Sequence, residues 1–485
     1  MAQNNNLPAN LSVLRHQDDH ITNHIWEGNE RVLRPRRHSI WILKHTDLID
    51  PRVRMVIDAA GFGHVLKVSN MEINHLMVTA LCERWRTETH TFHMPLGETT
   101  VTLEDVSLQL GMPIDGEPVT GGTSGNLLQL CQDLLGDIPP ENMFTGNRIK
   151  LSWLNSRFRE LPDDATLVTV GQYARAHILI LIGCMLMPDT SASLVHFMFL
   201  PLLADLEHIS NFSWGSAVLA CLYRALDHST KFHQDNIGGC MLLLQCWAWE
   251  RFTCISPEIQ AVTEDEIVAG LAFPLSVRWC RQTRSLFHDQ TTVVGFRKKF
   301  DQIQPKQFLW TPYRQPHVNR MIIINVSPIS RALVPLICFA TVEFHQVDRV
   351  VRQFGWRQNI PSDPMNLDEG EPFTKSGHLR DNSPYMQWYI NHTIRYITTN
   401  AQSSDDEYDM PEQYQNPPSH QQFRPDTPFS GLLHSQNVSA GFGNWDHRMH
   451  PPSSSQQVPS SYGFFPAPSN FGSGPAQCYG GSGGP

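Results

Sequence analysis

Charge is scarce in this sequence. Asp, Glu, Lys and Arg make up 17% of the 485 residues, whereas soluble domains usually have about 25%. The formal net charge is −10, so the chain lacks the overall basic balance that favours sequence-independent binding to phosphates. Two local basic clusters are candidate nuclear-import or nucleic-acid patches, with solvated or carboxylate-paired surface as the alternative. They consist of Arg31, Arg34, Arg36 and Arg37, and of Arg297, Lys298 and Lys299.

The motifs of several enzyme classes are also missing. A phosphate-binding loop needs glycines followed by Lys-Ser or Lys-Thr, and no Gly-Lys dipeptide occurs. Gly61-Phe62-Gly63 lacks the third glycine of a dinucleotide-binding fingerprint. The glycines of residues 121–125 do not have the spacing of a hydrolase nucleophile elbow, and a flexible loop explains them better. The sequence therefore predicts no assembled catalytic site.

The ten cysteines include no Cys-x-x-Cys pair. Most stand in apolar helical contexts, and the spacing of Cys240, Cys246 and Cys254 matches no zinc module, which favours core packing. This usage is typical of a reducing compartment, where cysteine behaves as a small buried hydrophobe.

Targeting and membrane-spanning segments are not found either. Met1–Asn10 is polar and lacks the apolar core of a signal peptide. The longest apolar stretch, Ile178–Met187, is short of the ~20 residues that span a bilayer. We expect a soluble protein of the cytosol or the nucleus, with no membrane partner.

The chain divides by composition into three parts. We predict a flexible leader at 1–14, a large helical domain at 15–400 and a disordered tail at 401–485. In the tail, an acidic run is followed by Pro, Ser, Gln and Gly with spaced aromatic residues. Such a segment cannot bury enough apolar surface to offset the ~1–2 kcal/mol that ordering each residue's backbone costs. The aromatic residues are either weak multivalent contact sites or part of a solvated tail.

Helical periodicity dominates the middle part, so the predicted fold class is mainly α. Ser69–Glu72 fits a capping box, and apolar residues follow it at three-to-four spacing. Several helical runs are apolar nearly all round, which predicts burial in a large core. These runs are Leu167–Met187, Ser193–His208, Ser213–Asp227 and Gly239–Phe252. Leu333–Phe344 fits either a strand or a buried helix.

One stretch has the pattern of β structure. Residues with high β-propensity flank turn residues at Pro95–Glu98, so we predict a small hairpin over Thr89–Thr102. Thr102–Asp105 then caps a short helix, and Gly111 ends it. The acidic residues Glu104 and Asp105 suit the positive end of that helix better than acid–base catalysis.

Histidines supply the remaining candidates for chemistry. His16, His20 and His24 recur at four-residue spacing, so on a helix they would share one face and could hold zinc. A capped surface helix is the alternative. His90 and His93 of the predicted hairpin are either functional or polar neighbours of its backbone. No residue is assigned as catalytic, cofactor-binding or metal-binding.

The most specific motif lies between residues 80 and 116. It comprises ALCERWR (80–86), THTFHMP (89–95), GETTVTLEDV (97–106) and LGMPIDG (110–116). Consistent segments follow in order: SWGSA (213–217), LQCWAWERF (244–252), WTPY (310–313) and RVVRQFG (349–355). With these segments the sequence resembles the plant mobile domain family, also described as aminotransferase-like, from about residue 59 to residue 361.

The resemblance implies a nuclear plant protein similar to the maintenance-of-meristems proteins. Their expected roles are meristem maintenance, gene regulation and transposon silencing. Related domains also occur in transposable elements, and the family has links to plant phosphatase 7 long-form proteins. No catalytic residue is established for the domain, so the resemblance carries none over.

The aminotransferase-like label predicts a Schiff-base lysine, a phosphate cup and an alternating strand–helix pattern. The lysines are Lys44, Lys67, Lys150, Lys231, Lys298, Lys299, Lys306 and Lys375. None follows a strand-like run that suggests a desolvated amine, and the alternating pattern is absent. The metal motifs of a phosphatase are missing too. We therefore expect a non-enzymatic protein without a cofactor.

Three functions stay open: a nuclear factor that binds proteins, a phosphatase 7-like protein among them, a transposon-derived factor associated with nucleic acid, or an unrecognised enzyme. Spatial clustering of four basic residues would favour nucleic acid: Arg84, Arg86, Arg297 and Lys298. A deep pocket lined by His90, His93 and Glu98 would instead favour an enzyme. Five tryptophans are expected in the core, and an exposed one would mark a binding face: Trp85, Trp214, Trp247, Trp249 and Trp310.

Overall fold

The computed structural model of the chain describes residues 7–35, 49–68, 71–122, 126–191, 193–283, 292–364 and 383–397. Within them helices dominate, and the strands form small sheets of two or three strands. The predicted mainly α fold is confirmed. Several predicted features lie outside the described residues: the tail 401–485, Ser69, Arg36, Arg37, Lys44 and Lys375.

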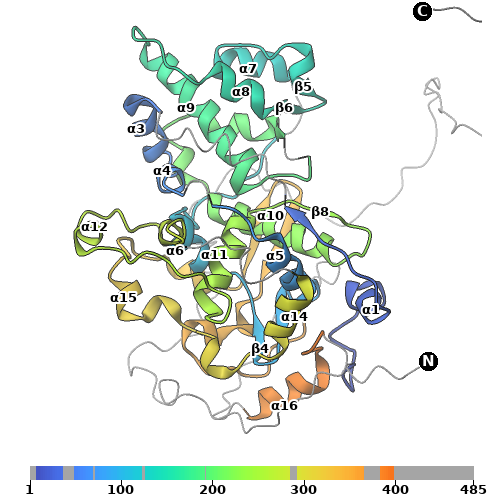
Figure 1. Cartoon of the computed structure of the whole chain (residues 1–485). Helices are drawn as coiled ribbons and strands as arrows, with labels where there is room; N and C mark the ends of the chain where they lie inside the picture. The colour runs from blue at the N-terminus through green and yellow to red at the C-terminus, as the bar shows by residue number, and fades with distance from the viewer. Residues whose placement is uncertain are drawn as a thin grey trace, which may run out of the picture. The chain divides into compact units, whose positions relative to one another are not determined.

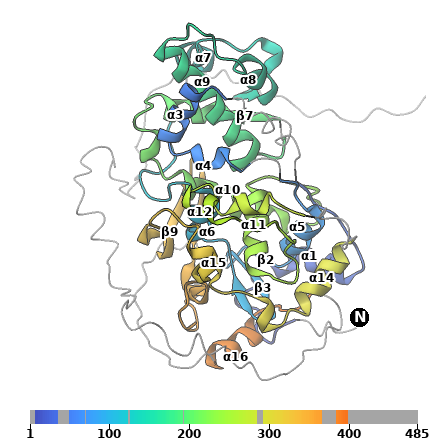
Figure 2. The same cartoon turned by 60° about the vertical axis from the view of Figure 1, so that its left-hand side comes forward.

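One group of helices surrounds α9 (Leu167–Leu181), which continues into the π-helical turn η4 (Ile182–Leu186). Helices α3 (Pro51–Ala59), α7 (Leu127–Leu135) and α8 (Leu151–Arg157) all contact α9, as Figures 1 and 2 show. The predicted helical run from Leu167 is thereby confirmed.

The stretch Leu167–Leu186 is long and apolar enough to cross a membrane by length and composition alone. However, 67% of the most apolar 18-residue part of this stretch is buried inside the protein. Its contacts with α3, α7 and α8 are those of a central core helix.

A second group of helices centres on α10 (Trp214–Ser229) and α11 (Met241–Arg251), which lie near the middle of Figure 1. Both contact α6 (Leu103–Leu110). Helix α5 (His75–Cys82) packs against α11 and against α14 (Val293–Asp301). The predicted helices at 213–227 and 239–252 are confirmed to within a few residues.

The predicted hairpin is present and gains one strand. Strands β3 (Thr91–Met94) and β4 (Gly97–Thr99) pair antiparallel, with Met94 opposite Gly97, so Pro95 and Leu96 form the turn. A further strand, β2 (Trp85–Arg86), pairs with β3 on its other side. The capping box of Thr102 and Asp105 then starts α6, and Gly111 ends it with φ 67°.

Leu333–Phe344, which by its sequence fitted either a strand or a buried helix, belongs to a hairpin. Strands β9 (Val334–Cys338) and β10 (Thr341–His345) pair antiparallel, and both contact α10. Glu343 and His345 are the buried side chains of β10, so the alternation of the strand points them into the protein.

Two local predictions are wrong. Ser193–His208 is not a helix: it contains β7 (Leu194–His196) and a 3-10 segment, η5 (Phe197–Leu203). Pro201 lacks an N–H for a longer helix, and β7 pairs with β6 (Arg148–Lys150) instead. The helix expected directly after Ser69 begins only at His75, where the Asn74 side chain accepts a hydrogen bond from the Met77 N–H.

Both ends of the described chain meet. Val13 and Leu14 form a small buried cluster with Ile394 and Ile397, and the Asn10 N–H donates to the Asn391 carbonyl at 2.8 Å. Ordered packing therefore begins inside the segment 1–14 that composition marks as a leader.

The remaining elements are short. The helices are η1 (Gln17–Asp19), α1 (Ile21–Trp26), α4 (Gly63–Leu66), η3 (Glu141–Met143), η6 (Ile209–Asn211), α12 (Glu264–Val268), α13 (Ser276–Trp279), η7 (Pro305–Gln307), η8 (Pro312–Arg314), α15 (Pro316–Asn319), η9 (Pro328–Arg331), η10 (Val347–Arg349), η11 (Val351–Phe354) and α16 (Ser383–His392). The strands are β1 (Arg34–Pro35), β5 (Phe144–Thr145) and β8 (Asn236–Ile237).

Candidate functional site

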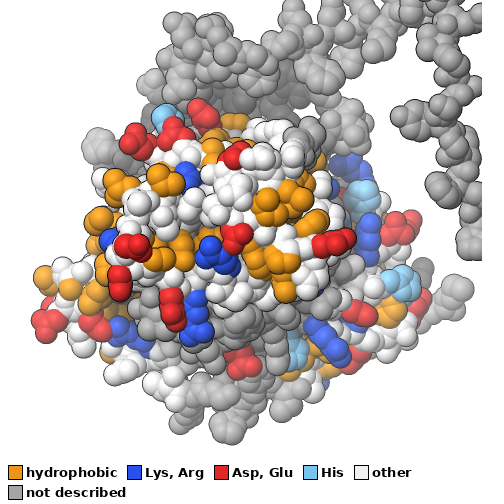
Figure 3. Space-filling model, turned by 90° about the horizontal axis from the view of Figure 1, so that it is seen from above, with side chains coloured by type: hydrophobic (Ala, Val, Ile, Leu, Met, Phe, Trp, Pro, Cys, Tyr) orange, Lys and Arg blue, Asp and Glu red, His pale blue; other side chains and the backbone are white. Residues whose placement is uncertain are grey.

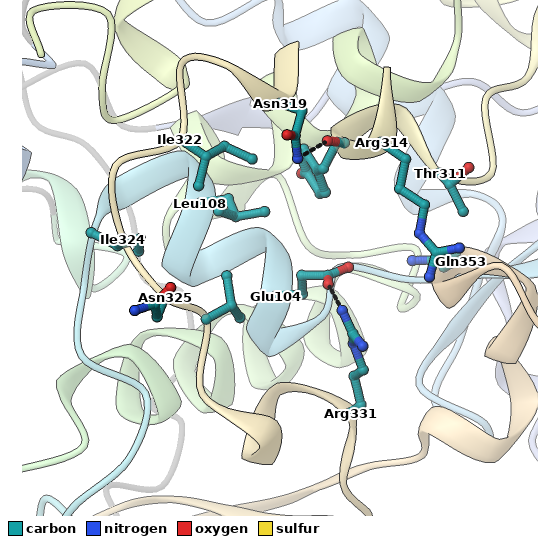
Figure 4. A pocket seen from close by; sticks show the side chains of 12 residues that line it. Glu104, Leu108, Thr311, Arg314, Asn319, Ile322, Ile324, Asn325, Arg331 and Gln353 are labelled. Atoms are coloured by element: carbon teal, nitrogen blue, oxygen red, sulfur yellow. Dashed lines mark hydrogen bonds and ion pairs between the residues drawn. The ribbon is translucent and has the colours of Figure 1, made fainter. Parts of the chain in front are cut away.

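A pocket of about 290 Å³ lies beside α6, between the segment 311–326 and η9. Figure 4 shows the side chains that line it. Both polar and apolar groups line its wall. They belong to Glu104, Leu108, Thr311, Tyr313, Arg314, Asn319, Ile322, Ile324, Asn325, Val326, Arg331 and Gln353.

Helix α6 supplies one wall of the pocket. Glu104 and Leu108 are one helical turn apart, so they lie on the same face. Glu104 accepts a hydrogen bond from Arg331 Nη2 at 2.9 Å, and its side chain is 11% exposed. Burial raises the pKa of Glu104, and the nearby Arg331 opposes that effect. The sequence suggested a capping role for this glutamate, but Asp105 makes the cap and Glu104 faces the pocket.

The rest of the wall offers hydrogen-bond donors and acceptors. Arg314 donates to the Phe354 carbonyl at 2.5 Å, and Asn319 donates to the Tyr313 carbonyl at 3.4 Å. Asn325 is exposed at the rim. Among the described residues that line the pocket, no hydroxyl or thiol lies next to a histidine base. The arrangement is therefore better suited to binding than to nucleophilic catalysis.

The basic residues that would favour a nucleic-acid groove do not form one. Arg84, Arg86 and Arg297 are at most 6% exposed. Arg84 pairs with Asp301, and Arg297 forms a two-pronged ion pair with Glu83 at 2.8 Å. On the face of the molecule seen in Figure 3, acidic, basic and apolar side chains are interspersed. The three buried arginines cannot contact phosphates, and Lys298 is the exposed residue of the four, so this test goes against the nucleic-acid hypothesis.

The hairpin residues expected to line a deep pocket also lie elsewhere. Glu98 is fully buried in an ion pair with Arg349, at 2.6 and 2.9 Å. His93 is 1% exposed, and burial together with Arg86 lowers its pKa well below 6.5. Neither residue lines the described pocket. The described residues therefore do not form the deep pocket lined by His90, His93 and Glu98 that would have favoured an enzyme.

His90 lies in a different environment, which could not be predicted from the spacing of residues along the chain. Its ring lies beside Asp227 of α10 and Glu343 of β10. Burial disfavours the charged imidazole, but hydrogen bonds to Asp227 and Glu343 raise the pKa of His90 to about 10. Among the described residues, His90, Asp227 and Glu343 form a group whose potential ligand atoms are close enough to share a metal ion.

The three regularly spaced histidines near the N-terminus are separated by the structure. His16 is exposed, His20 is buried at the N-cap of α1, and His24 stacks on Phe232 with ring centroids 4.2 Å apart. The Nε2–H of His20 donates to the Trp85 carbonyl at 2.9 Å, and its Nδ1 accepts from the Thr22 N–H. The chain bends at His20, so no single helix face presents all three rings.

The other candidates are core residues. Burial raises the pKa of Cys240 to about 12 and that of Cys246 well above its usual value, so both are protonated packing groups. No lysine lines the described pocket. The five tryptophans expected in the core are all at most 5% exposed, so none marks a binding face: Trp85, Trp214, Trp247, Trp249 and Trp310.

Comparison with known families decides the classification. The model of the plant mobile domain matches residues 61–416. This chain belongs to the plant mobile domain family. The domain thus includes both the Glu104–Arg331 pocket and the His90 cluster.

Relatives from Arabidopsis thaliana agree with this assignment. Protein MAIN-LIKE 1 is 35% identical, over 81% of this chain and 81% of its own length. Protein MAINTENANCE OF MERISTEMS is 31% identical, over 79% of this chain and 83% of its own length. A serine/threonine-protein phosphatase 7 long form homolog is 37% identical over 81% of this chain, but only 32% of that protein is covered. No solved structure matches this chain.

Proposed function

We propose that this plant mobile domain protein is a non-enzymatic nuclear factor that binds other proteins in meristem maintenance, gene regulation and transposon silencing. The observation that carries the binding role is the Glu104–Arg331 pocket, a surface hollow that combines guanidinium, amide and apolar groups. The role in meristems is supported by the names of the relatives, which include MAINTENANCE OF MERISTEMS.

The pocket suits a short segment of a partner protein. Leu108, Ile322 and Ile324 can surround one apolar side chain, while Arg314 and Asn325 can meet backbone carbonyls or a carboxylate. Ile323, between two pocket residues, is 53% exposed and extends the apolar surface beyond the rim. A central apolar anchor with polar groups around it is the usual composition of a protein-binding hot spot.

A phosphatase 7-like protein is the partner we propose first. One relative carries a homologous domain within a longer chain whose name is serine/threonine-protein phosphatase 7 long form homolog. A domain joined to a phosphatase in one protein is a reasonable candidate to bind a phosphatase in another. The proposal is that this chain supplies the domain as a separate subunit.

Affinity purification from plant nuclei, with and without nuclease treatment, tests the proposed class of function. We expect the same protein partners in both samples, because Arg84 and Arg297, two of the residues that could hold nucleic acid, are buried and paired. Loss of the partners after nuclease treatment would show tethering through nucleic acid and contradict the proposal. A fluorescent fusion found only outside the nucleus would contradict the proposed location.

A further inference from the structure

Three segments that are far apart in the sequence bring His90, Asp227 and Glu343 together. His90 lies in the loop between β2 and β3, Asp227 in the last turn of α10, and Glu343 in β10. His90 Nε2 is 3.2 Å from Glu343 Oε2 and 3.5 Å from Asp227 Oδ2. All three potential ligand atoms lie within 4.8 Å of one another.

The second polar atom of each side chain is already engaged. His90 Nδ1 is 3.2 Å from the Phe344 carbonyl, which can only accept, so this nitrogen carries a hydrogen. Trp85 Nε1 donates to Asp227 Oδ1 at 2.7 Å, and Arg224 Nε pairs with Glu343 Oε1 at 2.5 Å. The other polar atom of each side chain, His90 Nε2, Asp227 Oδ2 and Glu343 Oε2, faces the other two residues. Hydrogen bonds to His90 and Asp227 and an ion pair to Glu343 orient the three groups, as outer contacts do in metal sites.

The distances also fit a metal ion. Zinc binds histidine nitrogen and carboxylate oxygen at about 2.0–2.2 Å, so the ligand atoms of a tetrahedral site are about 3.3–3.5 Å apart. The two contacts of Nε2, at 3.2 and 3.5 Å, agree with that spacing.

The backbone is held in an uncommon conformation to place this ring. His90 has φ 48°, in the left-handed region that non-glycine residues rarely adopt. Thr100 Oγ1 donates to the His90 carbonyl at 2.7 Å and fixes it there. The rings of Trp85 and Tyr223 flank the imidazole, with centroids 6.0 and 5.2 Å from it. The ring therefore has little freedom to turn away from the two carboxylates.

We propose that His90, Asp227 and Glu343 bind a zinc ion, which replaces the proton on His90 Nε2 and releases it to solvent, with water as the fourth ligand. One imidazole and two carboxylates suit a borderline divalent ion, whereas Ca²⁺ and Mg²⁺ prefer oxygen ligands alone. The three side chains are 5–12% exposed. The ion would join the β2–β3 loop, α10 and β10, and so lock the hairpin motif onto the core.

Zinc content of the full-length protein tests this site. After incubation with Zn²⁺ and removal of free metal, we expect about one zinc per wild-type chain by mass spectrometry. Asp227→Asn and Glu343→Gln keep the size of each side chain but should weaken zinc binding at least tenfold. The control Glu266→Gln changes a glutamate paired with Arg281 on another surface and should bind as the wild type does. Wild-type protein that retains no zinc, or equal retention by all variants, would overturn the proposal.

A spectrum of the wild type covers the case in which the ligand variants do not fold. Co²⁺ in this site should give the intense visible absorption of a tetrahedral ion with nitrogen and oxygen ligands, and Zn²⁺ should abolish it. A weak octahedral spectrum, or the charge-transfer bands of thiolate ligands, would show that the ion sits elsewhere.

Discussion

At the scale of single residues, most of the buried charges pair with a partner from a distant part of the chain. Glu98 pairs with Arg349, and Asp105 pairs with Arg251, in both cases with side chains that are 0% exposed. The sequence could predict the local caps, such as Thr102 on α6, because both partners lie within one turn. It could not predict these pairs, because nothing in the spacing of residues 251 and 349 points back to the hairpin region.

Removing one partner of a buried pair should destabilise the protein strongly. Glu98→Gln leaves the guanidinium of Arg349 buried without its counter-charge, so we expect the free energy of unfolding to fall by about 3–5 kcal/mol. Glu264→Gln removes an exposed partner of Arg320 and should change the free energy of unfolding by less than about 1 kcal/mol. Urea unfolding followed by circular dichroism measures both, and similar losses for the two variants would refute the explanation.

His20 should make stability depend on pH. Burial, with Arg86 nearby, lowers the pKa of His20 well below 6.5, so the folded protein keeps it neutral. The unfolded chain takes up a proton near pH 6.5, so stability is retained above that pH and is lost as the pH falls below it. The slope is at most about 1.4 kcal/mol per pH unit.

The variant His20→Asn isolates this effect. Asparagine keeps an acceptor for the Thr22 N–H but does not titrate. Between pH 7 and pH 5.5, the variant should lose less stability than the wild type, by up to about 1.3 kcal/mol. Equal losses in urea unfolding at the two pH values would show that His20 does not contribute.

At the scale of elements, periodicity predicted the long apolar helices and turn chemistry predicted the hairpin. Predictions failed where tertiary contacts override local preference. Ser193–His208 has apolar residues at helical spacing, yet β7 adds to β6 and Pro201 prevents a long helix. The second hairpin, β9–β10, was ambiguous because a short apolar run fits both states.

The turn of the first hairpin gives an element-scale prediction. Gly97 has φ 124°, and a Cβ there would collide with the guanidinium of Arg352, which stacks over Trp310 at 3.8 Å. Gly97→Ala should therefore cost about 2–4 kcal/mol of unfolding free energy. Gly146→Ala is the control, because φ is 54° but the space is open, and about 1 kcal/mol is expected. Thermal unfolding that ranks the two variants equally would contradict the proposed close contact.

At the scale of the whole molecule, the family could be inferred from ordered motifs, and the match over 61–416 shows it. The pocket could not be predicted, because its lining comes from α6, the segment 311–326, η9 and η11. Thr311, Tyr313 and Gln353 stood in the family motifs, but of its polar residues only Glu104 had been given a role in the sequence, and a different one. Surfaces built from several segments have no signature in any one of them, and the His90 cluster is a second example.

The most direct test of the account is to fill the pocket. Asn325 is exposed at its rim, so Asn325→Trp should block the pocket without disturbing the core. Asn147→Trp places the same side chain at an exposed site between β5 and β6, away from the pocket lining. In quantitative affinity purification from plant nuclei, we expect Asn325→Trp to recover at least tenfold less of the partner proteins, and Asn147→Trp to recover wild-type amounts. Undiminished partner recovery by a folded Asn325→Trp protein would contradict the assignment of this pocket as the protein-binding site.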